Sequence, residues 1–123
     1  MDKVWMVVLA ITISCSASSQ QNFEIISSDQ LGILEAEKDD LIFLDVRTPR
    51  EVSAGHIKDA LLIDFRSPKF TEEIKNLDRK RSYVVYCASG IRSNKAMQIM
   101  KDLGFKEVYD LSGGYKSYVG KHE

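Results

Sequence analysis

Short apolar runs along the chain alternate with segments of helical spacing. Four runs are rich in the β-branched and aromatic residues typical of strands. They are Phe23–Ile26, Leu41–Val46, Val84–Cys87 and Lys106–Leu111. Because Leu41–Val46 is nearly continuous in apolar residues, we expect it to be a central parallel strand that is buried on both faces.

Three segments between these runs show the three- and four-residue spacing of an amphipathic helix. Their apolar positions are Leu31, Leu34 and Ala36; Phe70, Ile74 and Leu77; and Ala96, Ile99, Met100 and Leu103. Ser27 or Ser28 can cap the first helix. Ser89 or Ser93 can cap the third, which Gly104 would end. The alternation predicts a single α/β domain: a mostly parallel sheet of about five strands with helices on both faces.

The first residues of the chain have the pattern of a signal peptide. Lys3 precedes the apolar run Val4–Ile13, which is shorter than the about 20 residues of a membrane-spanning helix. The polar stretch Ser16–Asn22 has the composition of a flexible tether. We therefore assign residues 1–22 to a signal peptide and tether and residues 23–123 to the domain. An exported protein, periplasmic or at the cell surface, is expected.

The segment Thr12–Cys15 resembles a bacterial lipoprotein signal, in which cleavage occurs before the cysteine and lipid is attached to it. Thr12 stands where that signal usually has leucine. The resemblance implies that Cys15 anchors the protein to a membrane, which would leave Cys87 as the only thiol of the mature domain. Two alternatives stay open: ordinary cleavage near Ala17 or Ser18, which would release a secreted protein, and a buried N-terminal helix.

Composition and charge narrow the classes of function. A chain of 123 residues can bury the core of one small domain. The formal net charge is −1, and no basic run is interleaved with aromatic residues, so no nucleic-acid partner is expected. Two cysteines are too few for a disulfide framework. His56 and His122 form no cluster at metal-ligand spacing, so neither a metal nor a cofactor is expected.

Cys87 stands where a strand pattern gives way to a loop of small residues and then to a helical pattern. A thiol in this position would face backbone N–H groups and the positive end of the helix dipole, which stabilise a thiolate. The alternative is an inert, buried cysteine. Gly90 and Arg92 follow within the same loop, and they favour the reactive interpretation.

The segment Cys87–Arg92 resembles the active-site loop of single-domain rhodanese-like sulfurtransferases, which reads C-x-x-G-x-R. Leu44–Glu51, Gly55–Ile57 and Leu111–Tyr115 resemble other signatures of that family, so the resemblance covers the chain from about residue 23 onward. It implies that Cys87 takes sulfur from a small anionic donor such as thiosulfate. The sulfur would pass through a persulfide to a thiol or cyanide acceptor.

The resemblance also implies roles for the residues around the cysteine. Backbone N–H groups of the loop would hold the persulfide. The loop consists of Ala88, Ser89, Gly90, Ile91, Arg92 and Ser93. Arg92 would bind an anionic donor, unless it forms an ion pair with a nearby carboxylate. We expect three residues to brace this end of the sheet: Asp45, Arg47 and His56. Contact with substrate stays open for Asp45 and Arg47, and a role as general base stays open for His56.

Two other functions stay open. Phosphatases of this superfamily have an active-site loop one residue longer, so the spacing from Cys87 to Arg92 argues against hydrolysis of phosphate esters. A non-enzymatic module that docks or carries sulfur at the membrane is the second alternative. Retention of Cys87, Gly90 and Arg92 argues for chemistry, but a carrier and a transferase would share all three.

The segment after His56 departs from the family pattern. Asp59 stands where many members have a turn glycine, and Leu62 stands where they have asparagine. Because aspartate tolerates a left-handed backbone better than most residues do, we expect the turn to persist. The change to leucine leaves open how this edge of the sheet is held.

Overall fold

Five strands form the centre of the structure, a computed structural model that describes residues 20–122. The strands are β1 (Asn22–Ile26), β2 (Ile42–Asp45), β3 (Leu61–Leu62), β4 (Ser82–Tyr86) and β5 (Glu107–Leu111). They lie in the order β1-β5-β4-β2-β3, and every neighbouring pair is parallel. The predicted α/β fold with a parallel sheet of five strands is confirmed.

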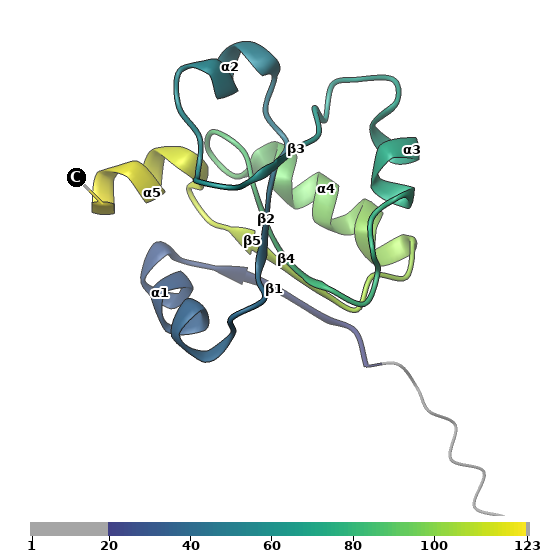
Figure 1. Cartoon of the computed structure of the whole chain (residues 1–123), viewed down its shortest axis with the longest axis horizontal. Coiled ribbons are helices and arrows are strands. Elements are labelled where there is room, and N and C mark those ends of the chain that lie inside the picture. Colours follow the sequence, from purple (N-terminus) through teal and green to yellow (C-terminus); the bar gives the residue numbers. More distant parts are fainter. Residues whose placement is uncertain (1–19, 123) are drawn as a thin grey trace, which may run out of the picture.

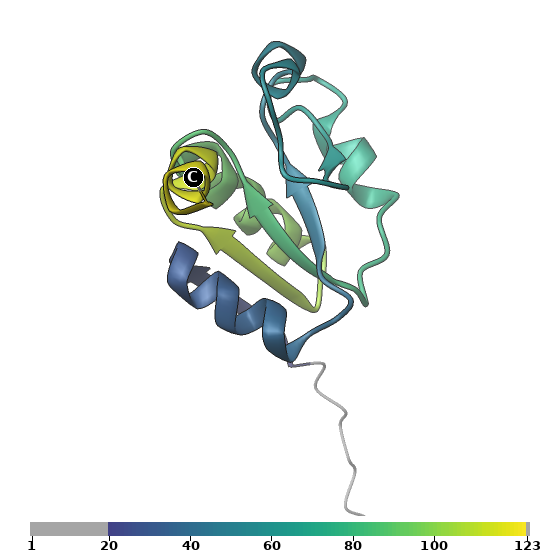
Figure 2. The same ribbon diagram turned by 60° about the vertical axis from the view of Figure 1, so that its left-hand side comes forward.

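Helices cover both faces of this sheet (Figure 1). The helices are α1 (Ser28–Glu37), α2 (Pro49–Ser53), α3 (Phe70–Lys75), α4 (Ile91–Asp102) and α5 (Gly114–His122). α1 and α5 lie on one face, whereas α3 and α4 lie on the other. Figure 2 shows the strand arrows running in one direction, toward the end of the molecule where α2 and α5 lie. None of the helices within residues 20–122 has the length and apolar character needed to cross a membrane.

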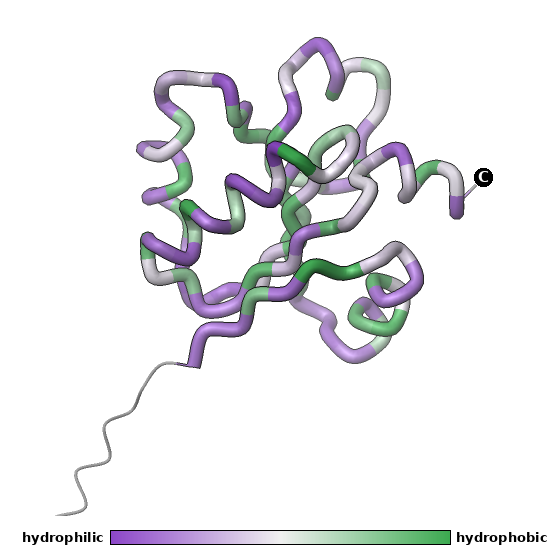
Figure 3. The backbone as a smooth tube through the Cα atoms, turned by 180° about the vertical axis from the view of Figure 1, so that it is seen from behind, coloured by the Kyte–Doolittle hydropathy of each residue, from purple (hydrophilic) through white to green (hydrophobic). Residues whose placement is uncertain are grey.

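The core lies on both faces of β4, all of whose residues are buried. Tyr83 and Val85 pack on the face covered by α3 and α4. Val84 and Tyr86 pack on the opposite face, against residues of α1 and α5. Figure 3 shows hydrophobic positions concentrated along the central strands and hydrophilic ones in the outer turns. The strand that leads to Cys87 is therefore the most completely buried strand of the sheet.

The prediction that Leu41–Val46 is a central strand buried on both faces is wrong in part. β2 is second from the edge, and β3, its outer neighbour, pairs only with Leu44 and Asp45. Ile42 and Phe43 are therefore only half-buried. The central position belongs to β4, since β5 and β1 follow on its other side.

The edge near β3 is held by backbone hydrogen bonds. Asp59 adopts a left-handed conformation with a φ of 62°, so the predicted turn at this position is confirmed. Leu61 and Leu62 are exposed. Just beyond them, the N–H group of Ile63 donates to the carbonyl oxygen of Asp45 at 3.0 Å. Main-chain pairing thus holds this edge.

The helix boundaries agree with most of the expected signals. Ser27 caps α1, and its hydroxyl accepts the N–H group of Gln30 at 3.2 Å. α3 ends at Lys75, before the predicted Leu77. The predictions for the signal peptide, including Cys15, concern residues outside those that the structure describes.

Candidate active site

Cys87 directly follows β4, at the carboxyl edge of the sheet, where α/β proteins bind ligands. The residue is only 1% exposed and packs with the core on the α3 and α4 face. Its Sγ accepts the N–H group of Gly90 at 3.0 Å. The hydroxyl oxygen of Ser93 lies 3.5 Å from the same sulfur. The sulfur is thus enclosed by the loop that follows it.

The start of α4 differs from the predicted capping. Gly90 occupies the N-cap position with a φ of 107°, and no side chain caps the helix. A left-handed conformation of this kind favours glycine. Ser93, one of the two predicted caps, lies inside the helix and donates its hydroxyl proton to Asp110. The first turn of α4 therefore keeps backbone N–H groups that can face the sulfur.

These groups change the acidity of the thiol. Burial raises the pKa of Cys87. The N–H groups of Ser93, Gly90 and Ser89, together with the Ser93 hydroxyl when its proton points at the sulfur, lower it further than burial raises it, so the pKa lies below its ordinary value. A lowered pKa favours the thiolate, which is the nucleophilic form of cysteine. The setting favours a reactive cysteine over an inert one.

The first turn of α5 supports the loop from behind. The N–H group of Tyr115 donates to the carbonyl oxygen of Cys87 at 2.7 Å, and that of Lys116 donates to Ala88 at 3.3 Å. A Cβ atom on Gly114 would lie 2.4 Å from the same Cys87 oxygen. Glycine at this position therefore lets the backbone of α5 approach the loop closely.

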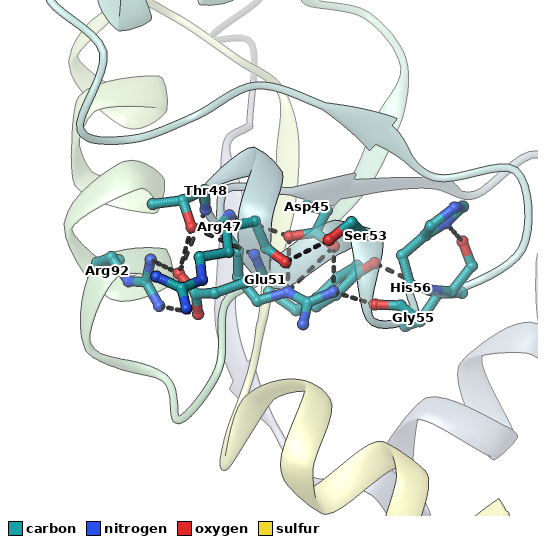
Figure 4. Close-up of polar contacts among 11 residues, drawn as sticks. Asp45, Arg47, Thr48, Glu51, Ser53, Gly55, His56 and Arg92 are labelled. Atoms are coloured by element: carbon teal, nitrogen blue, oxygen red, sulfur yellow. Dashed lines mark hydrogen bonds and ion pairs between the residues drawn. The ribbon is translucent and has the colours of Figure 1, made fainter.

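Arg92 reaches from α4 toward α2 (Figure 4). Its Nη1 and Nη2 atoms donate to the two carboxylate oxygens of Glu51 at 2.7 and 2.8 Å. This contact holds the pKa of Glu51 down to about 2. The ion pair left open from the sequence is therefore present. A guanidinium carries five N–H groups, so the pair occupies only part of its donor capacity beside the loop.

Asp45 and Arg47 form a buried ion pair at the end of β2 (Figure 4). Asp45 is 0% exposed and Arg47 is 6% exposed. The Nη2 atom of Arg47 donates to Asp45 at 2.8 Å and to the carbonyl oxygen of Gly55 at 2.7 Å. Its guanidinium carbon lies 4.3 Å from the centroid of the Tyr115 ring. Arg47 thus joins β2, the Gly55 loop and α5.

His56 lies on the neighbouring loop, exposed to solvent. Its Nδ1 atom is 2.9 Å from the carbonyl oxygen of Ile57. The N–H group of Ile57 in turn donates to the Tyr86 hydroxyl at 3.0 Å. Within residues 20–122, the side-chain hydrogen bonds of Cys87 involve Gly90 and Ser93 and not this histidine. His56 therefore belongs to the loop packed against the end of β4.

Asp110 is a buried site residue that the sequence analysis missed. It lies on β5, is 2% exposed, and accepts the Ser93 hydroxyl at 2.6 Å and the Asn94 amide at 3.3 Å. The signal was present in the apolar run Lys106–Leu111, because a carboxylate inside a buried strand requires a polar partner. Its partners could not be identified from the run alone.

The chain resembles known proteins in sequence and in fold. Residues 30–121 match the family model described as Rhodanese-like domain. Thiosulfate sulfurtransferase GlpE from Coxiella burnetii is 34% identical over 97 residues, which are 76% of this chain and 89% of that protein. The rhodanese-related protein from Thermoplasma volcanium has a solved structure with a TM-score of 0.70 and 30% identity. That match covers 80% of this chain and 92% of the solved one.

A further group of relatives is much longer than the matching region. The tRNA uridine(34) hydroxylase of Cytophaga hutchinsonii is 38% identical over 85 residues, or 67% of this chain. Those residues make up 27% of the hydroxylase. The chain therefore spans roughly a quarter of the length of this relative.

Proposed function

The chain belongs to the rhodanese-like domain family, and we propose that it acts as a sulfurtransferase that carries sulfur on Cys87. The observation that carries the proposal is the environment of the Cys87 sulfur. Cys87 Sγ lies 3.0 Å from the Gly90 nitrogen, in a loop that lowers the pKa of the thiol. The similarity to GlpE supports the proposal because it extends over 89% of that enzyme.

The proposed reaction has two steps. The Cys87 thiolate attacks the outer sulfur of a donor such as thiosulfate and forms a new S–S bond. The S–S bond of the donor breaks, and sulfite leaves with the electron pair. A thiol or cyanide acceptor then attacks the terminal sulfur of the persulfide, and Cys87 departs as a thiolate. Such a ping-pong sequence is typical of covalent catalysis.

The backbone of the loop supplies the main stabilisation in this scheme. Donors already oriented toward developing negative charge contribute roughly 3 to 4 kcal/mol each. The N–H group of Gly90 is oriented toward the sulfur, and the hydrogen bonds from α5 to Cys87 and Ala88 hold the loop backbone in place. The loop therefore stabilises the thiolate and the persulfide anion without a dedicated base.

Arg92 is proposed to bind the anionic donor. Glu51 fixes the position of its guanidinium through two hydrogen bonds. Arginine binds oxyanions through planar pairs of N–H groups, which lysine does not reproduce. The N–H groups that point away from Glu51 would meet the oxygens of thiosulfate. Asp45, Arg47 and His56 are proposed to support the surrounding backbone, with no direct part in the transfer.

Intact mass spectrometry of the full chain tests the proposal. Thiosulfate treatment is expected to add one sulfur atom, which cyanide removes with release of thiocyanate. The matched control is Cys87→Ser, which keeps Cys15 and therefore reports any sulfur taken up there. A wild-type protein that gains no sulfur, although its Cys87 thiol is shown to be free and reduced, would contradict the proposal.

The same sample separates an enzyme from a dedicated carrier. With excess thiosulfate and cyanide, a transferase releases many thiocyanate ions per protein molecule. A dedicated carrier that is loaded by a partner releases about one equivalent over the same time, because thiosulfate reloads it only slowly. Continued release that depends on Cys87 is the expected result.

We further propose that the protein is exported and held at a membrane by lipid on Cys15. Support comes from the order of Lys3, the apolar run Val4–Ile13 and the cysteine. A polar stretch of chain then precedes β1, which begins at Asn22. The lipid would hold the domain near a membrane surface in the periplasm or at the cell surface.

A further inference from the structure

We infer that Asp110 controls the ionisation of Cys87 through the hydroxyl group of Ser93, with the cysteine and the aspartate sharing one proton. The inference deepens the proposed function and rests on it, because it assigns a regulatory arrangement to the same sulfur. Asp110 is a positioning residue in this scheme: it acts on Cys87 only through Ser93.

Three buried side chains form a continuous chain of hydrogen bonds from the sulfur to β5. Cys87 Sγ lies 3.5 Å from Ser93 Oγ, and Ser93 Oγ lies 2.6 Å from Asp110 Oδ1. The exposed fractions of the three residues are 1%, 0% and 2%. Bulk water is therefore largely excluded as a replacement partner. The protonation state of Asp110 must then affect that of Cys87, and the reverse.

The Ser93 hydroxyl has one proton to donate. When Asp110 is ionised, the hydroxyl donates to the carboxylate, and its lone pair accepts the S–H group of Cys87. When Asp110 is protonated, its O–H group donates to Ser93, and the hydroxyl proton points at the sulfur. The first arrangement stabilises the thiol of Cys87, and the second stabilises the thiolate.

The two arrangements differ only in the positions of two protons. The Cys87 proton moves from Sγ to Ser93 Oγ as the Ser93 proton moves to Asp110 Oδ1. No atom or electron is gained or lost, and the total charge of the chain stays the same. Asp110 thus takes up the proton that Cys87 must lose before it attacks a sulfur donor.

Ionising the Cys87 thiol and the Asp110 carboxyl at the same time is unfavourable. A thiolate and a carboxylate would then compete for the single proton of Ser93, and both anions would lie in a buried region. The pair is therefore expected to lose its first proton readily and its second only at higher pH. Burial raises the pKa of Asp110 more than Ser93 and Asn94 lower it, whereas the pKa of Cys87 is lowered. These opposite shifts bring the two acidities closer together, which favours sharing.

No neighbouring charged group replaces Ser93 as the link between Cys87 and Asp110 within residues 20–122. The residues opposite Asp110 in the flanking strands are Ile25 and Val85, which do not ionise. Lys95 of α4 lines the same open cavity of about 470 Å³ as Asp110. Within residues 20–122, the hydrogen-bond partners of the Asp110 carboxylate are Ser93 and Asn94, a hydroxyl and an amide. Arg92, next to Ser93 in sequence, is paired with Glu51.

The test measures the rate at which iodoacetamide alkylates Cys87 in the full chain from about pH 4 to about pH 10. Peptide mass mapping separates this modification from any at Cys15. For wild type we expect the alkylation rate to rise twice with increasing pH, with a plateau between the two rises, because the pair loses its protons in two steps. Asp110→Asn should give a single rise, since a neutral amide can donate to Ser93 and leaves its hydroxyl to the thiolate. If the proton is shared about equally, the variant reacts about twofold faster on the plateau.

Two further variants make the result specific. Ser93→Ala breaks the chain and removes a donor, so it should give a single rise at higher pH than Asp110→Asn does. Ser112→Ala changes a residue that lines the same cavity but takes no part in the hydrogen bonds between Cys87 and Asp110. This variant should keep both rises in the alkylation rate. A folded Asp110→Asn protein whose profile coincides with that of wild type would overturn the inference.

The outcome is independent of sulfur transfer. Two rises in wild type together with failure to form a persulfide would contradict the proposed function and leave the coupling standing. Persulfide formation with a single rise in wild type would contradict the coupling and leave the proposed function standing.

Discussion

At the scale of single residues, the two arginines near the loop have partners in different environments. Arg47 is buried, with its guanidinium between Asp45, Gly55 and the ring of Tyr115. Arg92 is less enclosed and meets Glu51 with two of its nitrogens. A buried guanidinium whose donors meet protein atoms suits a structural role, whereas a partly exposed one can still meet a ligand. We therefore expect Arg47 to support the loop and Arg92 to bind the donor.

Arg47→Met tests the supporting role. The change leaves the Asp45 carboxylate buried without its charged partner, which typically costs about 3 to 5 kcal/mol of unfolding free energy. Urea denaturation should show this loss. Arg50→Met is the matched control, because Arg50 is exposed in α2 and its loss should change stability by no more than about 0.5 kcal/mol. Equal effects of the two changes would mean that Asp45 does not depend on Arg47.

At the scale of elements, the active-site loop is held between two helices. α4 begins at its far end and supplies the N–H group of Gly90 to the sulfur. α5 donates two backbone hydrogen bonds to the carbonyl groups of Cys87 and Ala88. This second contact requires Gly114, whose φ of 59° and close approach to the loop leave no room for a side chain. We therefore expect the position of α5 to set the shape of the loop.

Gly114→Ala is expected to destabilise the protein and to disturb the loop. A left-handed conformation at a residue other than glycine costs of order 1 to 3 kcal/mol, and the added methyl group would overlap the Cys87 carbonyl. Urea denaturation and the alkylation rate of Cys87 measure the two effects. In Gly120→Ala, a change in the same helix, the methyl group would meet no atom within 4 Å. This control should be neutral or stabilise by up to about 1 kcal/mol.

An alkylation rate that is unchanged in Gly114→Ala would mean that α5 does not shape the loop. A loss of stability without a change in rate would restrict the role of Gly114 to folding. A fall in both, with Gly120→Ala unaffected, is the expected pattern.

Local sequence patterns predicted the elements, and long-range contacts decided what they missed. Apolar runs and helical spacing were enough for most strands and helices, since these signals lie within a few residues of one another. The capping of α4 was wrong because Ser93 bonds to Asp110, 17 residues along the chain. The order of the strands placed β4, and not β2, at the centre. Both features depend on residues that meet only in the folded chain.

At the scale of the whole molecule, the parallel sheet separates the start of the domain from the sulfur. β1 begins with Asn22 at the amino edge of the sheet, whereas Cys87 follows the carboxyl end of β4. A strand of five residues spans roughly 17 Å, so the two lie on opposite edges. The start of β1 lies away from α2 and α5 (Figure 1). A domain anchored through its N-terminus would present Cys87 away from the membrane.

Cys15→Ala tests the proposed anchor in a bacterial host that exports and lipidates proteins. Wild type should sediment with membranes and enter a detergent phase, because two or more acyl chains give stable anchoring. The variant should lose lipid and remain in the soluble fraction. Cys87→Ser, which keeps the anchor residue, should sediment as wild type does. A Cys15→Ala protein that stays with membranes would show that the apolar run Val4–Ile13 is the anchor, and a soluble wild-type protein would favour ordinary cleavage.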